Sequence, residues 1–369
     1  MKIQPESATK TANIIIDFFS NIDRIDDYFR LRKIERVKNL PAPIPGFGLE
    51  DDMFQNYDMH PEDMDIEVAQ IDNQTFNAML EKVASFSPDQ APGKELKLVV
   101  KEKNTNTLLG FIKLGSPIIN SKPRNNYLGD VPELTIFNQR AIMGFVIVPV
   151  QPFGYNYLGG KLMALICTSH KVREMLNDKY ETEFCLFETT SLYGNIKGMS
   201  MYDGLKPFLR FKGDTESKFV PTLGEEAYAS CKKIIEDDVQ GEIIHKDASS
   251  RKLKITTKMI SLIKSSLKET DMELHDKFVS AIKKAESVTT QKRFYMSDYG
   301  YENTRDVLLG KTETLIKGPN YHKHDLENII SWWKRKASSR YNKLKSEDRI
   351  REELEVWNAD TMNKIDIIR

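Results

Sequence analysis

The residues of this chain whose types and spacing favour chemistry begin at a glycine-bearing turn. Gly159 and Gly160 follow an apolar segment and precede a helical pattern, with Lys161 directly after them. The first amides of a helix lack partners within it, and the helix dipole favours an anion there. The turn therefore predicts phosphate or cofactor binding, or else a glycine pair that only lets the helix pack closely on a sheet. The predicted binding residues are Asn156, Tyr157, Leu158, Gly159, Gly160 and Lys161.

Two other side chains are candidates for acid–base catalysis. Glu188 ends a predicted strand, where ligands of α/β proteins commonly bind, and partial desolvation raises a carboxyl pKa towards that of a useful base. Tyr202 is the candidate proton donor to a leaving thiolate or amine. The alternatives are an ion pair of Glu188 with Arg210 or Lys206, and a core position for Tyr202 with a satisfied hydroxyl.

A third group combines cations with aromatic residues. Residues 331–345 place lysines and arginines among two tryptophans and a tyrosine. Aromatic rings stack on bases, at about 1–3 kcal/mol per base, while cations neutralise phosphates. The alternative is a helix that buries Trp332 and Trp333 in a core. The predicted nucleic-acid contacts are Arg124, Arg140, Lys206, Arg210, Trp332, Lys334, Arg335 and Arg340.

Strands and a helix must position the first two groups. Residues 96–101 and 108–114 read as strands joined by a turn, and residues 141–150 and 184–188 read as buried strands. The helical segment 158–169 lies between the latter two. A strand, turn, helix and strand in succession form a βαβ unit, whose two strands are parallel. The sequence therefore predicts a mixed α/β (α+β) domain with a mixed sheet flanked by helices.

The flanks of this domain have helical periodicity, which predicts three consecutive regions. They are a helical N-terminal segment with an acidic loop (1–90), the α/β domain (91–240), and a mostly helical, mildly basic region (241–369). Within the last, the aromatic residues 293–304 read as a loop. The acidic residues at 50–67 are interpreted as a solvated loop, with a mask over a basic groove and a metal-ligand loop as alternatives.

Composition narrows the class of protein. The net charge of zero combines 17 acidic and nine basic residues in 1–90 with 20 acidic and 26 basic residues in 241–369, which suggests surfaces with different partners. The three cysteines are widely spaced, and no metal site is predicted. Without a secretory signal or an apolar run long enough for a membrane span, the expected location is the cytoplasm.

Several short motifs in fixed order carry a resemblance to a known family. They are LLGFIKLGSP (108–117), KPRNNYLG (122–129), FNQRAIMGFVIVP (137–149), NYLGGKL (156–162) and FETTSLYGNIKGMSMYDGLKPFLRFKG (187–213). In this order the chain resembles the DruA-like family, typified by a component of the Druantia anti-phage defence system. The family's domain is similar to a divergent GNAT (acetyltransferase-like) domain, a fold broadly shared with the phage DNA-modification protein Mom.

This resemblance implies a site as well as a fold. It implies a V-shaped opening between strands 145–148 and 184–188, with a cofactor's pyrophosphate on the helix that begins near Asn156. The implied cofactor is acetyl-CoA or another acyl or nucleotide-containing donor. The resulting interpretation is a GNAT-like, acyltransferase-related protein of phage or anti-phage systems that modifies DNA or acts on nucleic acid.

Two alternatives remain open. One is a non-catalytic nucleic-acid-binding module that retains the fold without a cofactor. It is favoured by Tyr157, which stands where the acetyltransferase signature has its first glycine. The other is a protein-acetylating enzyme, for which the sequence identifies no peptide groove.

Overall fold

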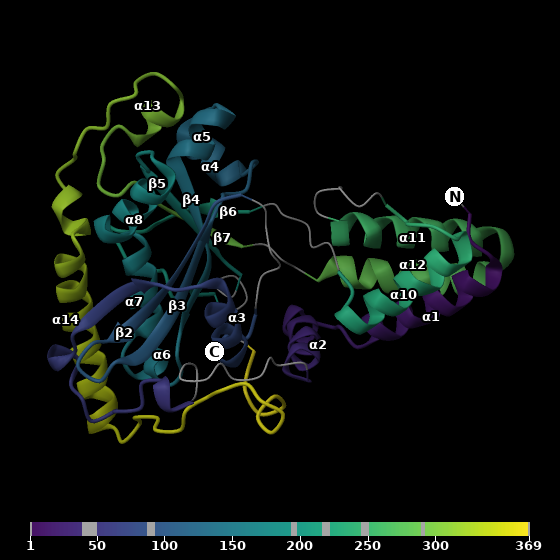
Figure 1. The fold of residues 1–369 in the computed structure, drawn as a ribbon, viewed down its shortest axis with the longest axis horizontal. Helices are drawn as coiled ribbons and strands as arrows, with labels where there is room; N and C mark the ends of the chain where they lie inside the picture. The colour runs from purple at the N-terminus through teal and green to yellow at the C-terminus, as the bar shows by residue number, and fades with distance from the viewer. Residues whose placement is uncertain are drawn as a thin grey trace. The chain divides into compact units, whose positions relative to one another are not determined.

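The computed structural model describes residues 2–38, 50–86, 93–192, 198–215, 222–244, 251–288 and 292–367. Two compact units divide the chain, one formed by residues 1–39, 217–290 and 366–369 and the other by residues 40–216 and 291–365 (Figure 1). This division differs from the three consecutive regions that the sequence predicted. Residues 217–290 pack with the N-terminal helices, whereas residues 291–365 return to the sheet.

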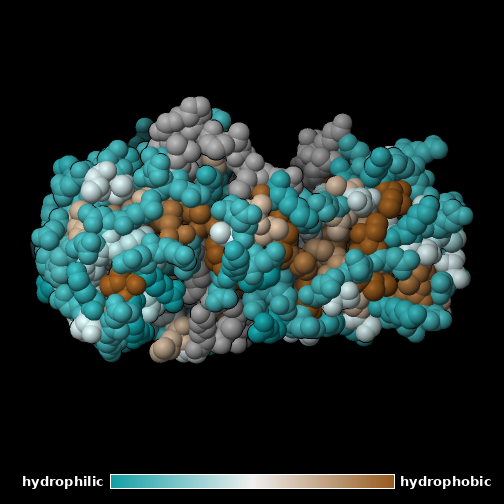
Figure 2. Space-filling model, turned by 90° about the horizontal axis from the view of Figure 1, so that it is seen from below, coloured by the Kyte–Doolittle hydropathy of each residue, from teal (hydrophilic) through white to brown (hydrophobic). Residues whose placement is uncertain are grey.

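The first unit is a helical bundle. Its described helices are α1 (Pro5–Ser20), α2 (Ile25–Lys38), α10 (Glu225–Val239), α11 (Arg251–Thr270) and α12 (Met272–Ser287). Pro5 opens α1, a position where its missing amide hydrogen costs nothing. The buried side of α1, which includes Ala12, Ile15 and Phe19, packs against α10, α11 and α12. Hydrophobic side chains are visible between hydrophilic ones on the bundle in Figure 2.

The second unit is built on a seven-stranded sheet. Its strands are β1 (Ile66–Gln70), β2 (Glu95–Glu102), β3 (Thr107–Gly115), β4 (Ala141–Pro149), β5 (Leu186–Ser191), β6 (Arg210–Asp214) and β7 (Arg293–Ser297). They follow the order β1-β2-β3-β4-β5-β7-β6, and every neighbouring pair is antiparallel except β4 and β5. The structure thus confirms the mixed α/β class and the predicted parallel pair.

Helices cover both faces of this sheet. The described helices of this unit are α3 (Asn73–Val83), α4 (Lys122–Leu128), α5 (Leu134–Arg140), α6 (Phe153–Asn156), α7 (Gly159–Cys167), α8 (His170–Tyr180), α13 (Thr304–Leu308) and α14 (Leu326–Ser346). Met163 of α7 lies against Gly110, whereas Phe76 of α3 packs on Phe111. Successive residues of a strand point to opposite faces, so α7 and α3 cover opposite faces. On the outer side of α7 lies α14 (Figure 1).

The prediction of a loop at residues 293–304 was wrong at its start. Residues 293–297 form β7, which lies between β5 and β6 in the sheet. Both faces of β7 are covered, so its residues are buried without the alternation of polar and apolar residues that reveals a half-exposed strand. No helix among the residues described combines the length and the apolar character needed to cross a bilayer.

The two adjacent tryptophans of α14 have different surroundings. Trp333 is fully buried and its indole Nε1 donates to the Tyr157 carbonyl oxygen at 2.9 Å. Trp332 is half-buried beside Phe208. The core alternative therefore holds for Trp333.

We expect Trp333→Phe to lower the free energy of unfolding of the sheet unit by about 2–4 kcal/mol, because it loses the indole hydrogen bond and leaves a cavity. Trp332→Phe is the matched control, with an expected loss of about 1 kcal/mol or less. Denaturant unfolding followed by circular dichroism measures both. Equal losses would contradict the placement of Trp333 in the core.

Candidate functional site

The parallel strands β4 and β5 are paired over a short distance only. Their ladder joins Ala141–Gly144 to Leu186–Thr189 and ends there. The next residue of β4, Phe145, is an extra residue opposite β3, because its two neighbours pair with consecutive β3 residues. Such a bulge bends its strand and increases the local twist. From the bulge onwards β4 pairs with β3 alone as far as Pro149, while β5 stays on β7 as far as Ser191, so the two parallel strands diverge.

The turn that starts α7 has two glycines with different surroundings. Among the described residues, the amides of Gly159 and Gly160 donate to no backbone acceptor outside the helices. A Cβ atom on Gly159 would lie 2.6 Å from the Phe153 ring, so this glycine permits close packing. A Cβ atom on Gly160 would meet only the end of the flexible Met201 side chain, at 2.7 Å. An added side chain is therefore more easily accommodated at Gly160 than at Gly159.

Two of the predicted binding side chains point elsewhere. The ring of Tyr157 is fully buried between Phe153 and Tyr341, and its hydroxyl donates to a backbone carbonyl oxygen at 3.0 Å. Asn156 is also buried, and its amide group exchanges two hydrogen bonds with the backbone of Arg351, at 2.7 and 3.0 Å. Both side chains hold the fold together, and Tyr157 does not obstruct the two free amides.

The neighbours of the glycine pair are also engaged. Leu158 has a left-handed backbone, with φ at 56°, which turns the chain into α7. The ammonium group of Lys161 donates to the Asp203 carbonyl oxygen at 2.7 Å, and burial lowers the pKa of Lys161. The countercharge predicted from Lys161 is therefore directed towards residues 200–204. Of the predicted glycine pair, Gly159 is buried and Gly160 is half-buried at the start of α7.

Tyr202 lies where β4 and β5 part. Its ring packs edge-on against Tyr295 of β7, with centroids 5.3 Å apart. Burial raises the pKa of Tyr202, although its hydrogen bond with Thr189 acts in the opposite direction. The Thr189 hydroxyl in turn donates to the Gly144 carbonyl oxygen at 3.0 Å, at the last rung of the parallel ladder. Tyr202 therefore closes the inner end of the divergence.

Glu188 forms a fully buried ion pair with Arg124 of α4. The Nη1 atom of Arg124 lies 3.1 and 3.2 Å from the two carboxylate oxygens of Glu188, and neither side chain has exposed surface. The same guanidinium donates to the carbonyl oxygens of Ile118 and Ile119 and lies 4.0 Å from the Phe137 ring centre. Burial raises the pKa of Glu188 to about 7, against the opposing effect of Arg124.

The sheet separates the two predicted catalytic side chains. Across the β5–β7 ladder, Glu188 pairs with Met296, whereas Thr189, which bonds to Tyr202, pairs with Tyr295. Because alternate residues point to opposite faces, Glu188 faces α4 and Tyr202 faces α7. The structure does not bring Glu188 and Tyr202 together as acid and base. The partner of Glu188 is Arg124, so the predicted alternatives Arg210 and Lys206 were wrong.

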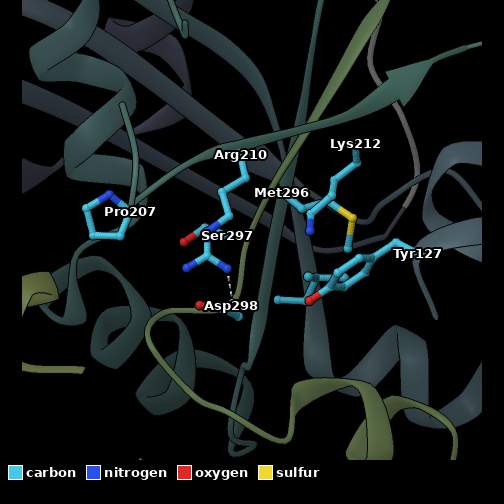
Figure 3. A pocket seen from close by; sticks show the side chains of 8 residues that line it. Tyr127, Pro207, Arg210, Lys212, Met296, Ser297 and Asp298 are labelled. Carbon is cyan, nitrogen blue, oxygen red and sulfur yellow. Dashed lines mark hydrogen bonds and ion pairs between the residues drawn. The ribbon is translucent and has the colours of Figure 1, made fainter. Parts of the chain in front are cut away.

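A small pocket lies on the Glu188 side of the sheet (Figure 3). Arg210 is 3.5 Å from the Asp298 carboxylate, and the Lys212 ammonium lies 3.5 Å from the centre of the Tyr127 ring. Burial lowers the pKa of Lys212, with a further contribution from Arg210. Sequence reasoning identified Arg210 but none of the others, since no local pattern links them. The lining residues are Tyr127, Leu186, Pro207, Arg210, Lys212, Met296, Ser297 and Asp298.

The cations predicted to contact nucleic acid are dispersed. The prediction that Arg124 contacts nucleic acid was wrong, because a guanidinium with no exposed surface cannot reach a phosphate. Arg140 pairs with Glu183 at 3.5 Å, at the start of β4. Lys206 is exposed, and Arg210 lies in the pocket.

The other predicted cations belong to α14. Arg335 is exposed, Lys334 donates to the Glu62 carbonyl oxygen at 2.8 Å, and Arg340 lies 4.6 Å from the Tyr155 ring centre. Asp58 of the acidic segment lies 3.7 Å from Lys345. This segment therefore touches one flank of α14. Residues 39–49, and residues 193–197 of the last motif, lie outside the described residues.

Comparison with known protein families gives a match. Residues 47–200 match the family model described as Druantia protein DruA. This confirms the DruA resemblance and extends it towards the N-terminus, over α3 and the acidic segment. No curated protein and no solved structure matches the chain.

We expect Arg124→Met to lower the free energy of unfolding by about 3–5 kcal/mol, because it leaves the Glu188 carboxylate buried without a countercharge. The double variant Arg124→Met, Glu188→Leu removes both charges and should be more stable than the single variant. Denaturant unfolding of both variants and of Glu188→Leu gives the coupling free energy between the two side chains. Additive losses would contradict a direct interaction.

The raised pKa of Glu188 also predicts a pH dependence. Between the ordinary value of 4.5 and about 7 the folded state binds more protons at Glu188 than the unfolded state does. Stability from this group is therefore lost as the pH rises through this window, by roughly 3 kcal/mol.

Thermal unfolding across this pH range should give a flatter profile for Glu188→Gln than for the wild type. Glu102 is the control, because its hydrogen bonds hold its pKa below the ordinary value even though burial raises it. Glu102→Gln should therefore change only the acid side of the profile. An unchanged slope in Glu188→Gln would contradict the raised pKa.

Proposed function

With the match of residues 47–200 to Druantia protein DruA as the premise, we propose that this chain acts in defence against phage, and that its sheet unit transfers a group from a phosphorylated donor to DNA. The donor class is acetyl-CoA or another acyl or nucleotide-containing thioester or phosphate carrier. The divergence of β4 and β5 beside the free amides of Gly159 and Gly160 carries this proposal.

The chemistry of these groups fits the phosphate part of such a donor. The first amides of a helix lack acceptors within it and can donate to a phosphate, and the dipole of α7 favours negative charge. The bulge at Phe145 leads β4 away from β5 and leaves this terminus next to the parting strands. Tyr202, which is hydrogen-bonded to Thr189 at the last rung of the ladder, is the proposed proton donor.

A second candidate function has its own support. Glu188 is held in a buried ion pair on the other face of the sheet, which leaves the opening without the base that the sequence predicted. Catalysis then depends on a base from the acceptor or the solvent. The alternative is a module that binds DNA without catalysis and retains the fold.

We expect coenzyme A or acetyl-CoA to bind the full-length chain, and Gly160→Ala to weaken that binding about tenfold, which corresponds to about 1.4 kcal/mol. The added methyl group stands between the ligand and the amides, while the flexible Met201 side chain gives way and preserves the fold. Isothermal titration calorimetry measures the affinity, and native mass spectrometry of freshly purified protein tests for a donor that co-purifies.

Gly241→Ala is the matched control, because a Cβ atom there meets its nearest neighbour at 3.9 Å, in the helical unit. The affinity of Gly241→Ala for coenzyme A or acetyl-CoA should equal that of the wild type. If no donor co-purifies and no heat of binding is measured, group transfer is contradicted and the non-catalytic alternative remains.

A further inference from the structure

Three arginines converge on a single tyrosine in the sheet unit. The guanidinium carbons of Arg351 and Arg340 lie 3.8 and 4.6 Å from the centre of the Tyr155 ring. Arg349 donates to the Tyr155 hydroxyl oxygen at 3.2 Å. Although its slight burial acts to raise the value, these positive charges lower the pKa of Tyr155.

The fold fixes this arrangement in place. Asn156, the neighbour of Tyr155, bonds to both the amide and the carbonyl of Arg351, at 3.0 and 2.7 Å. Arg340 comes from α14 and donates through Nε to the Tyr155 carbonyl oxygen at 3.4 Å. Segments far apart in the sequence are therefore held so that like charges lie close together, which is unfavourable unless an anion joins them.

Residues 347–355 also carry five carboxylates, of which two pair with these arginines, whereas Asp348, Glu352 and Glu353 are exposed. Glu347 lies 2.6 Å from Arg349, and Glu355 lies 3.5 Å from Arg351. Arg340 has no ion pair among the described residues. The Arg349 and Arg351 side chains are 53% and 54% exposed, so two of the three guanidinium groups are open to a partner.

The exposed side of α14 is rich in cations. Its exposed residues include Arg335, Lys336, Ser339, Asn342 and Lys343, and the only carboxylate within the helix is Glu327, in its first turn. Arg335 and Lys343 are about 12 Å apart along the helix axis, which spans several phosphates of a DNA strand. No large hydrophobic side chain is exposed on this helix.

We propose that Tyr155, Arg340, Arg349 and Arg351, together with the exposed side of α14, bind the sugar–phosphate backbone of duplex DNA. The inference rests on the proposed action on DNA and identifies the surface that holds it. Two guanidinium groups occupy the ring of Tyr155, so the ring is not free to stack on an unpaired base. Donors without a free aromatic ring match the backbone of a duplex better than a single strand.

The test compares two triple variants of the full-length chain in a salt series with a short labelled duplex. Changing the three arginines to glutamine should weaken binding at least about tenfold. It should also reduce the slope of log K against log salt by roughly 2–3, since each phosphate contact contributes about 0.9. The control removes three exposed lysines of α11 and should change the affinity about twofold or less. The control substitutions are Lys258→Gln, Lys264→Gln and Lys268→Gln.

Changing the same three arginines to lysine keeps the charge and tests the proposal if the glutamine variant fails to fold. Its salt slope should match that of the wild type. The proposal is overturned if the wild type does not bind the duplex at low salt, if the α11 control loses as much affinity, or if single-stranded DNA binds more tightly.

Coenzyme A titration keeps the two proposals apart. The glutamine variant should bind coenzyme A as the wild type does, because its substitutions leave Gly159 and Gly160 untouched. Loss of DNA binding with retained donor binding supports the proposed surface. If that variant still binds DNA as the wild type does, the proposed DNA-binding surface is contradicted. If the wild type does not bind the donor, only the proposed group transfer is contradicted.

Discussion

The constraint on which the sheet unit depends is the end of the parallel ladder at Gly144 and Thr189. One extra residue, Phe145, follows at that point, so β4 turns away with β3 while β5 continues with β7. Tyr202 lies at this point, because it is hydrogen-bonded to Thr189 at the last rung of the ladder. Glu188 lies on the other face, which α4 covers, because alternate strand residues point to opposite faces.

The Arg124–Glu188 pair shows how a charged couple can serve architecture. The guanidinium contacts a strand carboxylate, two carbonyl oxygens of the preceding loop and the ring of Phe137. These contacts tie α4, α5 and the loop before α4 to β5. Buried pairs of this kind contribute little net stability, yet they are costly to break because either charge alone is poorly solvated. The pair thus specifies one arrangement of the elements on that face.

Local patterns were sufficient for much of the fold. Alternation and apolar runs predicted β2, β3, β4 and β5, and the βαβ rule gave the parallel pair. They failed for β7, which is covered on both faces, and for the assembly of the two units, since no local signal reports which distant helices pack together. At the site, the roles of Gly160 and Tyr202 stay predictions. The sequence did not anticipate Arg124 as the partner of Glu188, because that contact depends on how α4 crosses the sheet.

The position of β7 has a consequence for synthesis of the chain. β7 lies between β5 and β6 in the sheet. Thr215, which follows β6, donates its amide to the carbonyl oxygen of Lys292, which precedes β7, at 2.8 Å. The intervening segment supplies α10, α11 and α12 to the other unit. A nascent chain that has reached residue 290 therefore carries β5 and β6 with their backbone edges unpaired. Until residues 293–297 leave the ribosome, those edges are open to association with other chains.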